Sequence, residues 1–421
     1  MRLPSLRRIL PLIVVVLGVL CSAHATAAMR PDVLDRRVDA LSRAQLLHDP
    51  PTALVDPARQ RAALWLMERR TAVWIAIALG ELLVFFLWWQ RGWAASWRDV
   101  LRRRLRNEHA VRWAFGATLG LIARIVAAIP QLYLFRLFRG AGLTSLPMHV
   151  WGLYWLEWTL IVAVGVGCVV AIVLALVDRT HLWYAITAVS VMGLTIGAAW
   201  IHPLLVPLIG GAGMRAPTAV MGEERQIAVR LGMASVPPIV VVPAMIAGGR
   251  PAIRVIGLWA TQRIVVDRAI LAAATPGEIR FELARVLWQI AHGIPLPRAI
   301  VLGALLILAI AGAVVLAERV PFRRDDDALA RLALVAAGCA AFALPAIGVD
   351  RAYERATALA GDRAAVAITD DPASAVRAIV RSADHDLIPI CGAPVGRFLF
   401  ARRPVPAERI AAVTGRPISC R

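Results

Sequence analysis

The sequence predicts a mostly α-helical protein that crosses a membrane several times and carries a small α+β domain outside the bilayer. Hydrophobic residues make up 59% of the 421 residues. The mean hydropathy of +0.67 is too high for a soluble globular chain. The apolar residues are gathered in long runs, which require a bilayer. We therefore expect lipid to surround much of the protein.

Residues 1–28 have the pattern of a secretory signal peptide. A basic start precedes an apolar core of about a dozen residues, and Ala-x-Ala cleavage sites follow at Ala23–Ala25 and Ala25–Ala27. The alternative is that this segment is retained as an anchor, which would be a seventh span. Residues 29–70 would form an extramembrane N-terminal segment.

Six later runs are long and apolar enough to cross a bilayer as helices, four within residues 71–210 and two within residues 299–349. They lie near Thr71–Trp89, Val111–Leu137, Val150–Val177, Leu182–Leu208, Ala299–Ala317 and Leu332–Val349. Residues 211–298 and 350–421 flank the last two spans. They would form the two halves of the α+β domain.

The formal charge of +19 is carried by arginine, because the chain contains no lysine. This bias indicates a GC-rich bacterial genome. The arginines gather in two loops, with Arg91, Arg98, Arg102–Arg104, Arg106 and Arg112 after the first span and Arg319, Arg323 and Arg324 between the last two. The positive-inside rule makes both loops cytoplasmic. The sequence thus predicts a protein of the bacterial inner membrane with a periplasmic α+β domain. No nucleic acid partner is expected, since the basic run lacks interleaved aromatic side chains.

The most informative motif is TPGEIRFELARVLWQ, residues Thr275–Gln289. Thr275 is a suitable N-cap and Pro276 suits the first helical position. Glu278, three residues after the cap, completes a capping box. A β-rich run and a short helix precede this helix start within Gly257–Ile279.

This order resembles the type I CAAX prenyl proteases, which are membrane-embedded zinc metallopeptidases with TPxEIxxVLAHExxH at this point. Two flanking matches keep the family's order. Upstream, His202–Pro217 and Glu223–Pro243 resemble its PLF and GxP patterns; downstream, Glu354–Arg381 resembles ExEAD…LTxDP and FLFARRPVPAERIAAV resembles FxxxHPxxxxRI. The resemblance covers roughly residues 200–415 and implies a metallopeptidase-like α+β domain.

In that family two His of HExxH and a later Glu hold zinc, and the Glu of HExxH activates water. The corresponding positions here hold Arg285, Gln289, Ala358 and, for the general base, Val286. Asp362 stands where the resemblance implies a carboxylate that orients the first His, and it could now pair with Arg285. Arg403 replaces a substrate-facing His, while Arg409 is kept. We expect no zinc and no other cofactor.

Other interpretations of this helix stay open. Glu282, Gln289 and His292 could form a different metal site, although no two of the eight His are three to five residues apart. Glu278–Ala291 could also be an amphipathic helix unrelated to peptidases. The residual cleft could hold an extended peptide as an added strand near Ala252, Arg254 and Gly257.

Charges inside the spans and cysteines near the C-terminus add two further expectations. Glu81, Arg124 and Glu157 interrupt apolar runs and should line a hydrated chamber or pair with one another. Cys391 and Cys420 would pair in an oxidising compartment or remain as packed thiols.

The favoured function is that of a catalytically inactive, zinc-free metallopeptidase homologue that binds or regulates membrane or exported proteins. An active membrane metalloendopeptidase with a non-standard site is the first alternative. A solute or lipid transporter is the second, although the sequence lacks the inverted repeats typical of that class.

The charge distribution gives a testable topology. A reporter fused after Arg106 should be active only in the cytoplasm, and one fused after Arg381 only in the periplasm, because arginine-rich loops stay inside. Paired alkaline phosphatase and green fluorescent protein fusions measure this. A fusion after Arg381 that is active only in the cytoplasm would refute the predicted orientation.

Overall fold

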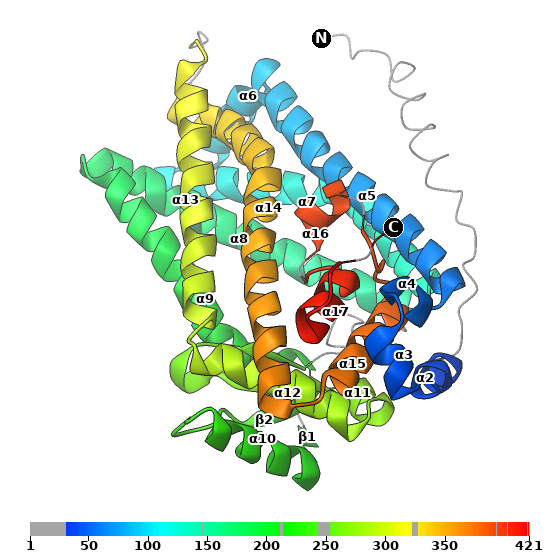
Figure 1. Cartoon of the computed structure of the whole chain (residues 1–421). Helices are drawn as coiled ribbons and strands as arrows, with labels where there is room; N and C mark the ends of the chain where they lie inside the picture. The colour runs from blue at the N-terminus through cyan, green and yellow to red at the C-terminus, as the bar shows by residue number, and fades with distance from the viewer. Residues whose placement is uncertain are drawn as a thin grey trace.

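A computed structural model describes residues 31–144, 146–210, 214–242, 253–321, 327–392, 394–401, 403–418 and 420. Long helices dominate it, and a small α+β domain lies at one end of them (Figure 1). Six of these helices are long and apolar enough to cross a membrane. The predicted fold class and number of spans are confirmed, whereas the predicted signal peptide lies outside the described residues.

Five of the six long helices contain one predicted span each and extend beyond it, and the remaining helix, α9, contains its span apart from Leu182. The six helices are α5 (Pro57–Gln90), α7 (Glu108–Gly140), α8 (Met148–Arg179), α9 (Trp183–Gly210), α13 (Pro295–Arg319) and α14 (Ala328–Thr369). Pro130 and Pro345 lie inside α7 and α14 without ending them, as neighbouring helices in a membrane allow. The last helix therefore runs unbroken from a span into the α+β domain.

Close contacts between small residues hold α7 against α8. A Cβ atom on Gly116 would lie 2.7 Å from the Val170 Cβ, and one on Gly120 would lie 3.0 Å from the Ala163 Cα. Helix–helix packing in membranes depends on such small residues, since apolar burial gives little net gain there. On another face of α7, Phe115 stacks on Trp88 of α5 with ring centroids 5.4 Å apart.

The arginine-rich loop folds as α6 (Trp93–Arg104). Arg98 and Arg102 both pair with Asp327, the N-cap of α14, at 3.0 and 3.1 Å. Figure 1 shows α6 at the end of the long helices opposite to the α+β domain. The arginine-rich loop and the α+β domain are predicted on different sides of the membrane. They thus lie at opposite ends of the molecule.

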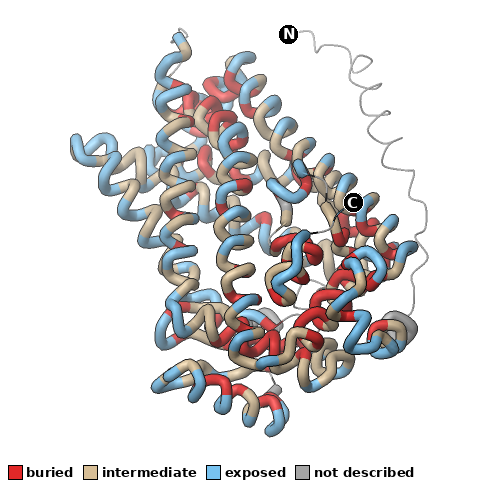
Figure 2. The backbone as a smooth tube through the Cα atoms, in the orientation of Figure 1, coloured by how far each residue is buried: buried red, intermediate tan, exposed pale blue. Residues whose placement is uncertain are grey.

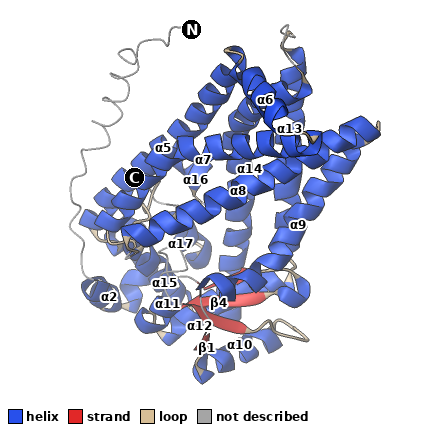
Figure 3. Cartoon of the chain, turned by 180° about the vertical axis from the view of Figure 1, so that it is seen from behind, coloured by secondary structure: helices blue, strands red, loops and turns tan. Residues whose placement is uncertain are grey.

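The α+β domain contains a four-stranded sheet of order β1-β2-β4-β3. Its strands are β1 (Met214–Arg215), β2 (Ile239–Val242), β3 (Ile253–Ile256) and β4 (Arg263–Asp267). β2 runs parallel to β4, and β3 runs antiparallel to β4 at the edge of the sheet. Figure 3 shows the strands beside the short helices of the domain.

Short helices surround this sheet and enclose the largest buried core (Figure 2). They are α10 (Thr218–Arg230), the 3-10 turn η2 (Trp259–Thr261), α11 (Arg268–Ala273), α12 (Pro276–Ala291), α15 (Pro372–His385) and α17 (Pro406–Thr414). The short helix α16 (Pro394–Phe400) packs instead against the long helices α5 and α14. The N-terminal segment adds α2 (Pro31–Asp39), α3 (Arg43–His48) and α4 (Pro51–Leu54). The core contains residues from both sides of the last two spans, for example Phe281 before them and Ile410 after them.

The glycine contacts between α7 and α8 predict a position-specific effect. Gly116→Ala should destabilise the protein by about 1–3 kcal/mol, because the new methyl group overfills a packed interface. Gly165→Ala in α8 is the matched control, since a Cβ there meets nothing within 4 Å. Thermal unfolding in detergent compares the two. Equal unfolding midpoints would contradict the close packing of α7 on α8.

Candidate functional site

Helix α12 begins as the sequence predicts. The Thr275 backbone N–H donates to Glu278 Oε2 at 2.6 Å, and the Glu278 N–H donates to Thr275 Oγ1 at 3.5 Å. This is the reciprocal capping box, with Pro276 in the first turn. Glu278 is buried and also accepts from Arg381 Nε at 3.0 Å. The predicted capping box is confirmed, and the same carboxylate fixes α12 to α15.

Arg285 lies buried on α12 and interacts with two carboxylates. Its Nε donates to Glu282 Oε2 at 3.1 Å and lies 3.8 Å from Asp362 Oδ1. The predicted proximity of Arg285 and Asp362 is therefore confirmed, although Glu282 is the nearer partner. A Cβ on Gly361 would lie 3.2 Å from the Arg285 Cγ. This glycine lets α14 approach α12 closely.

Asp362 forms its main ion pair with Arg409 of α17. Arg409 Nε donates to Asp362 Oδ2 at 2.7 Å, and Nη2 donates to Oδ1 at 2.9 Å. Asp362 is 0% exposed and Arg409 is 3% exposed. Arg409 Nη2 also lies 3.7 Å from Glu282 Oε1. The family resemblance marks Arg409 only as a retained residue, and its ion pair with Asp362 was not predicted.

Arg403, in the segment before α17, completes what we call the arginine cluster: Glu282, Arg285, Asp362, Arg403 and Arg409. Arg403 is half-buried, and within the described chain no hydrogen bond or ion pair joins its guanidinium to another residue. Burial and the neighbouring Arg285 lower the Arg403 pKa to about 10, against the attraction of Glu282. The guanidinium therefore stays charged at neutral pH.

The arginines also set the charge of Glu282. Burial alone would raise the pKa of this carboxyl, but Arg285, Arg403 and Arg409 outweigh burial and lower the pKa to about 2. Glu282 is thus a carboxylate near neutral pH, as its contacts with Arg285 and Arg409 require. The cluster then contains three cations and two anions, a net charge of +1 from its own five residues.

The remaining degenerate positions lie around this cluster. Val286 is fully buried, Gln289 is half-buried, and Ala358 lies one turn before Asp362 on α14. A zinc peptidase of this type binds its metal with two His and one Glu. The side chains of Arg285, Val286, Gln289 and Ala358 do not offer these donors. Among the described residues, no group of three His, Cys, Asp or Glu could hold a metal ion. His292, from the alternative set, ends α12 with its Nδ1 2.9 Å from the Trp288 carbonyl oxygen.

Two of the three cleft candidates lie on β3 or directly after it. Arg254 is exposed on this strand, and Ala252 lies outside the described residues. Gly257 follows the strand with φ +86°, where a Cβ would lie 2.5 Å from the Pro203 Cγ and 2.7 Å from the Thr261 carbonyl oxygen. Only glycine avoids both contacts, so Gly257 shapes the turn after β3.

The intramembrane charges do not form one cluster of direct ion pairs. Arg124 Nε donates to Thr159 Oγ1 at 3.3 Å, and its guanidinium lies 5.5 Å from the Trp155 ring centroid. Glu81 interacts with Arg124 electrostatically, without a direct ion pair among the described contacts. Glu157 is exposed on α8. Glu81 and Arg124 thus take part in the interactions between α5, α7 and α8.

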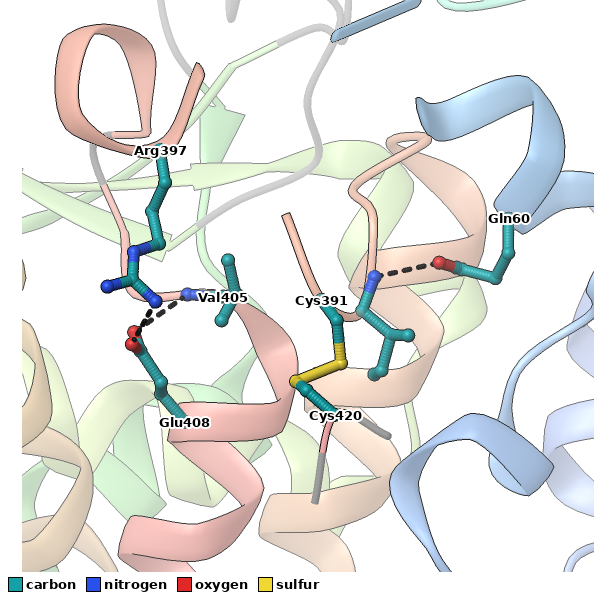
Figure 4. Close-up of a disulfide and its surroundings, with 7 residues drawn as sticks. Gln60, Cys391, Arg397, Val405, Glu408 and Cys420 are labelled. Atoms are coloured by element: carbon teal, nitrogen blue, oxygen red, sulfur yellow. Dashed lines mark hydrogen bonds and ion pairs between the residues drawn. A yellow bond between two sulfur atoms is a disulfide. The ribbon is translucent and has the colours of Figure 1, made fainter. Parts of the chain in front are cut away.

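A disulfide and an ion pair fix the two ends of the segment that contains Arg403 (Figure 4). Cys391 is bonded to Cys420. Of the two predicted alternatives, a disulfide or two packed thiols, the disulfide is the one observed. The Ile390 N–H beside it donates to Gln60 Oε1 at 2.7 Å. Glu408 accepts from Arg397 Nη1 at 2.9 Å and from the Val405 N–H at 3.3 Å. These contacts anchor the chain around Arg403.

Comparison with known proteins supports this architecture. No protein-family model matches the chain, and no curated protein matches it. Among solved structures, the crystal structure of S. mikatae Ste24p superposes with a TM-score of 0.65 and covers 91% of this chain and 96% of its own. The fold is that of Ste24p. The two sequences are 16% identical, so the likeness concerns the fold, in agreement with the resemblance to type I CAAX prenyl proteases.

The Asp362–Arg409 pair should be a strong stabilising contact. Asp362→Asn should cost about 3–5 kcal/mol, because it leaves Arg409 buried without its main counter-ion. Arg397→Gln breaks the more exposed pair with Glu408 and should cost about 0–1 kcal/mol. Thermal unfolding of both variants tests this. A smaller loss for Asp362→Asn than for Arg397→Gln would contradict the assigned role.

Proposed function

We propose that this protein is a zinc-free metallopeptidase homologue that binds extended segments of membrane or exported proteins without cleaving them. The observation that carries this proposal is Arg285, at the position that the resemblance assigns to the first zinc ligand. Its guanidinium is always protonated and cannot coordinate a metal. A fixed cation there also repels a dication.

The absence of a general base supports the same conclusion. Peptide hydrolysis at such a centre needs a carboxylate to take a proton from the attacking water. The position for that group holds Val286, and the nearest carboxylates, Glu282 and Asp362, are engaged by arginines. Neither carboxylate is free to act as a base.

Binding can use the sheet edge. β3 has β4 on one side and ends the described sheet on the other. An extended peptide can add to such an edge through main-chain hydrogen bonds, with side chains selecting the sequence. Binding without hydrolysis would let the protein retain or regulate a partner at the membrane surface.

A location of this domain in the bacterial periplasm is part of the proposal. The Cys391–Cys420 bond requires an oxidising compartment. The arginine-rich α6 lies at the other end of the long helices, where the positive-inside rule places the cytoplasm. The disulfide and the position of α6 favour the same orientation in the inner membrane.

Zinc analysis tests the central point. The purified protein should contain much less than one zinc per chain, because the ligand positions hold no donors of the required type. The comparison is a variant with Arg285→His, Val286→Glu, Gln289→His and Ala358→Glu, which restores the donor set where α12 faces α14. Elemental analysis should detect zinc in the variant only.

Two outcomes would contradict the proposal. Stoichiometric zinc in the unaltered protein, lost on Glu282→Gln or His292→Ala, would support the alternative metal site instead. A folded quadruple variant that takes up no more zinc than its parent would mean that these four positions do not converge.

A further inference from the structure

Helix α6 and the turns beside it contain two sets of arginines with different surroundings. Arg98 pairs with Asp99 at 2.8 Å and with Asp327 at 3.0 Å. Arg102 pairs with Glu108 at 2.9 Å and with Asp327 at 3.1 Å. Because Asp99, Glu108 and Asp327 already have partners, any remaining arginine of this region must find its anion elsewhere.

Three further arginines in or beside α6 are exposed, and within the described chain no hydrogen bond or ion pair joins their guanidinium groups to another residue. We call them the outer arginines: Arg91, Arg104 and Arg106. Residues 91–112 contain seven arginines against two acidic residues. The surface of α6 therefore attracts anions from outside the protein.

Exposed tryptophans share one face of α6 with an outer arginine. Trp93 is 46% exposed and Trp97 is 36% exposed. Trp93, Trp97 and Arg104 follow one another at intervals of four and seven residues, which places them on the same face of a helix. Another side of the helix, with Ala95 and Leu101, packs into a buried core. The free face of α6 thus combines aromatic rings with a cation, as in helices that lie at a membrane surface.

Contacts with α7 place the two ends of α6 at different depths. Near its C-terminal end, Arg102 Nη2 lies 2.9 Å from Glu108 Oε1, at the first residue of α7. Earlier in α6, Trp97 Nε1 donates to Thr118 Oγ1 at 3.1 Å, about 15 Å farther along α7 at 1.5 Å per residue. Thr118 lies inside the apolar span, and Glu108 precedes it. The tryptophans therefore lie nearer the hydrocarbon than the C-terminal end of α6, and tryptophan and arginine prefer these two levels of a bilayer.

We propose that α6 binds the headgroup phosphates of anionic phospholipids through the outer arginines, in the leaflet at this end of the molecule (Figure 1). A phosphate matches the charge and the donor pattern of a guanidinium. The rings of Trp93 and Trp97 lie beside the upper acyl chains of the same leaflet. Because Arg98 and Arg102 fix α6 to the N-cap of α14, the helix is held in place before the lipid binds, which reduces the entropy lost on binding.

A lipid fits this surface better than an acidic protein does. The free face of α6 continues from the arginine level to the level of Thr118 inside the span, where lipid surrounds the protein. The inference concerns the end of the molecule opposite to the candidate site and does not depend on the chemistry of that site. In the orientation proposed above, the lipid belongs to the cytoplasmic leaflet.

Thermal unfolding of the full chain in dodecyl maltoside, titrated with phosphatidylglycerol or with phosphatidylcholine of the same acyl chains, tests the proposal. A ligand that binds the folded protein raises the unfolding midpoint, so phosphatidylglycerol should raise it more than phosphatidylcholine does. The double variant Arg104→Gln with Arg106→Gln should weaken phosphatidylglycerol binding about fivefold for each arginine removed. Arg104→Lys with Arg106→Lys should keep part of the preference, because the charge remains. Higher ionic strength should reduce the preference.

Arg136→Gln with Arg139→Gln is the matched control. It also removes two exposed arginines, at the C-terminal end of α7, and should leave the phosphatidylglycerol titration unchanged. Cooperative unfolding of each variant in detergent alone shows that it is folded.

Three outcomes would overturn the inference. Equal effects of the two lipids on the unaltered protein would remove the preference for anionic headgroups. An equal loss in both double variants would show general attraction to positive charge and not a surface on α6. Stabilisation by soluble poly-glutamate or by inorganic phosphate as large as that by phosphatidylglycerol would assign the surface to an acidic protein or to free phosphate instead of a lipid.

Discussion

The buried ion pair between Asp362 and Arg409 is the contact on which the geometry of the candidate site depends. It joins α14, which continues from the last span, to α17, near the end of the chain. Because Glu282 and Arg285 of α12 contact the same pair, the three helices meet at one charged centre. In a zinc peptidase the metal holds such helices together. Here guanidinium–carboxylate pairs join the three helices.

A second network ties the N-terminal segment to the same domain. Arg381 of α15 donates to Glu278, Asp35 and Asp39 at 3.0, 2.5 and 2.5 Å, and Arg37 pairs with Asp384 at 3.0 Å. Glu278 thus has two functions, since it caps α12 and anchors α15. Through this carboxylate the beginning of the described chain supports the helix that carries Arg285. Local helix capping and long-range assembly therefore depend on one buried side chain.

The sequence predicts well what local pattern and hydropathy determine. The six spans follow from long apolar runs, and the capping box follows from Thr275, Pro276 and Glu278, which lie within four residues of sequence. It predicts less of what depends on distant partners. Arg409 lies 47 residues from Asp362, and no spacing rule indicates which arginine each carboxylate selects. The Cys391–Cys420 pairing stayed open for a related reason, because a bond or two packed thiols fit the same sequence.

Arginine at the position that the resemblance assigns to a zinc ligand changes what the site can respond to. Metal binding depends on metal supply and requires ligands that have lost their protons, whereas a guanidinium keeps its charge at any physiological pH. Glu282, with its pKa lowered to about 2, likewise stays ionised. The charge of the arginine cluster is therefore constant near neutral pH. A constant charge is one reason for proposing a binding role, because hydrolysis needs groups that gain and lose protons.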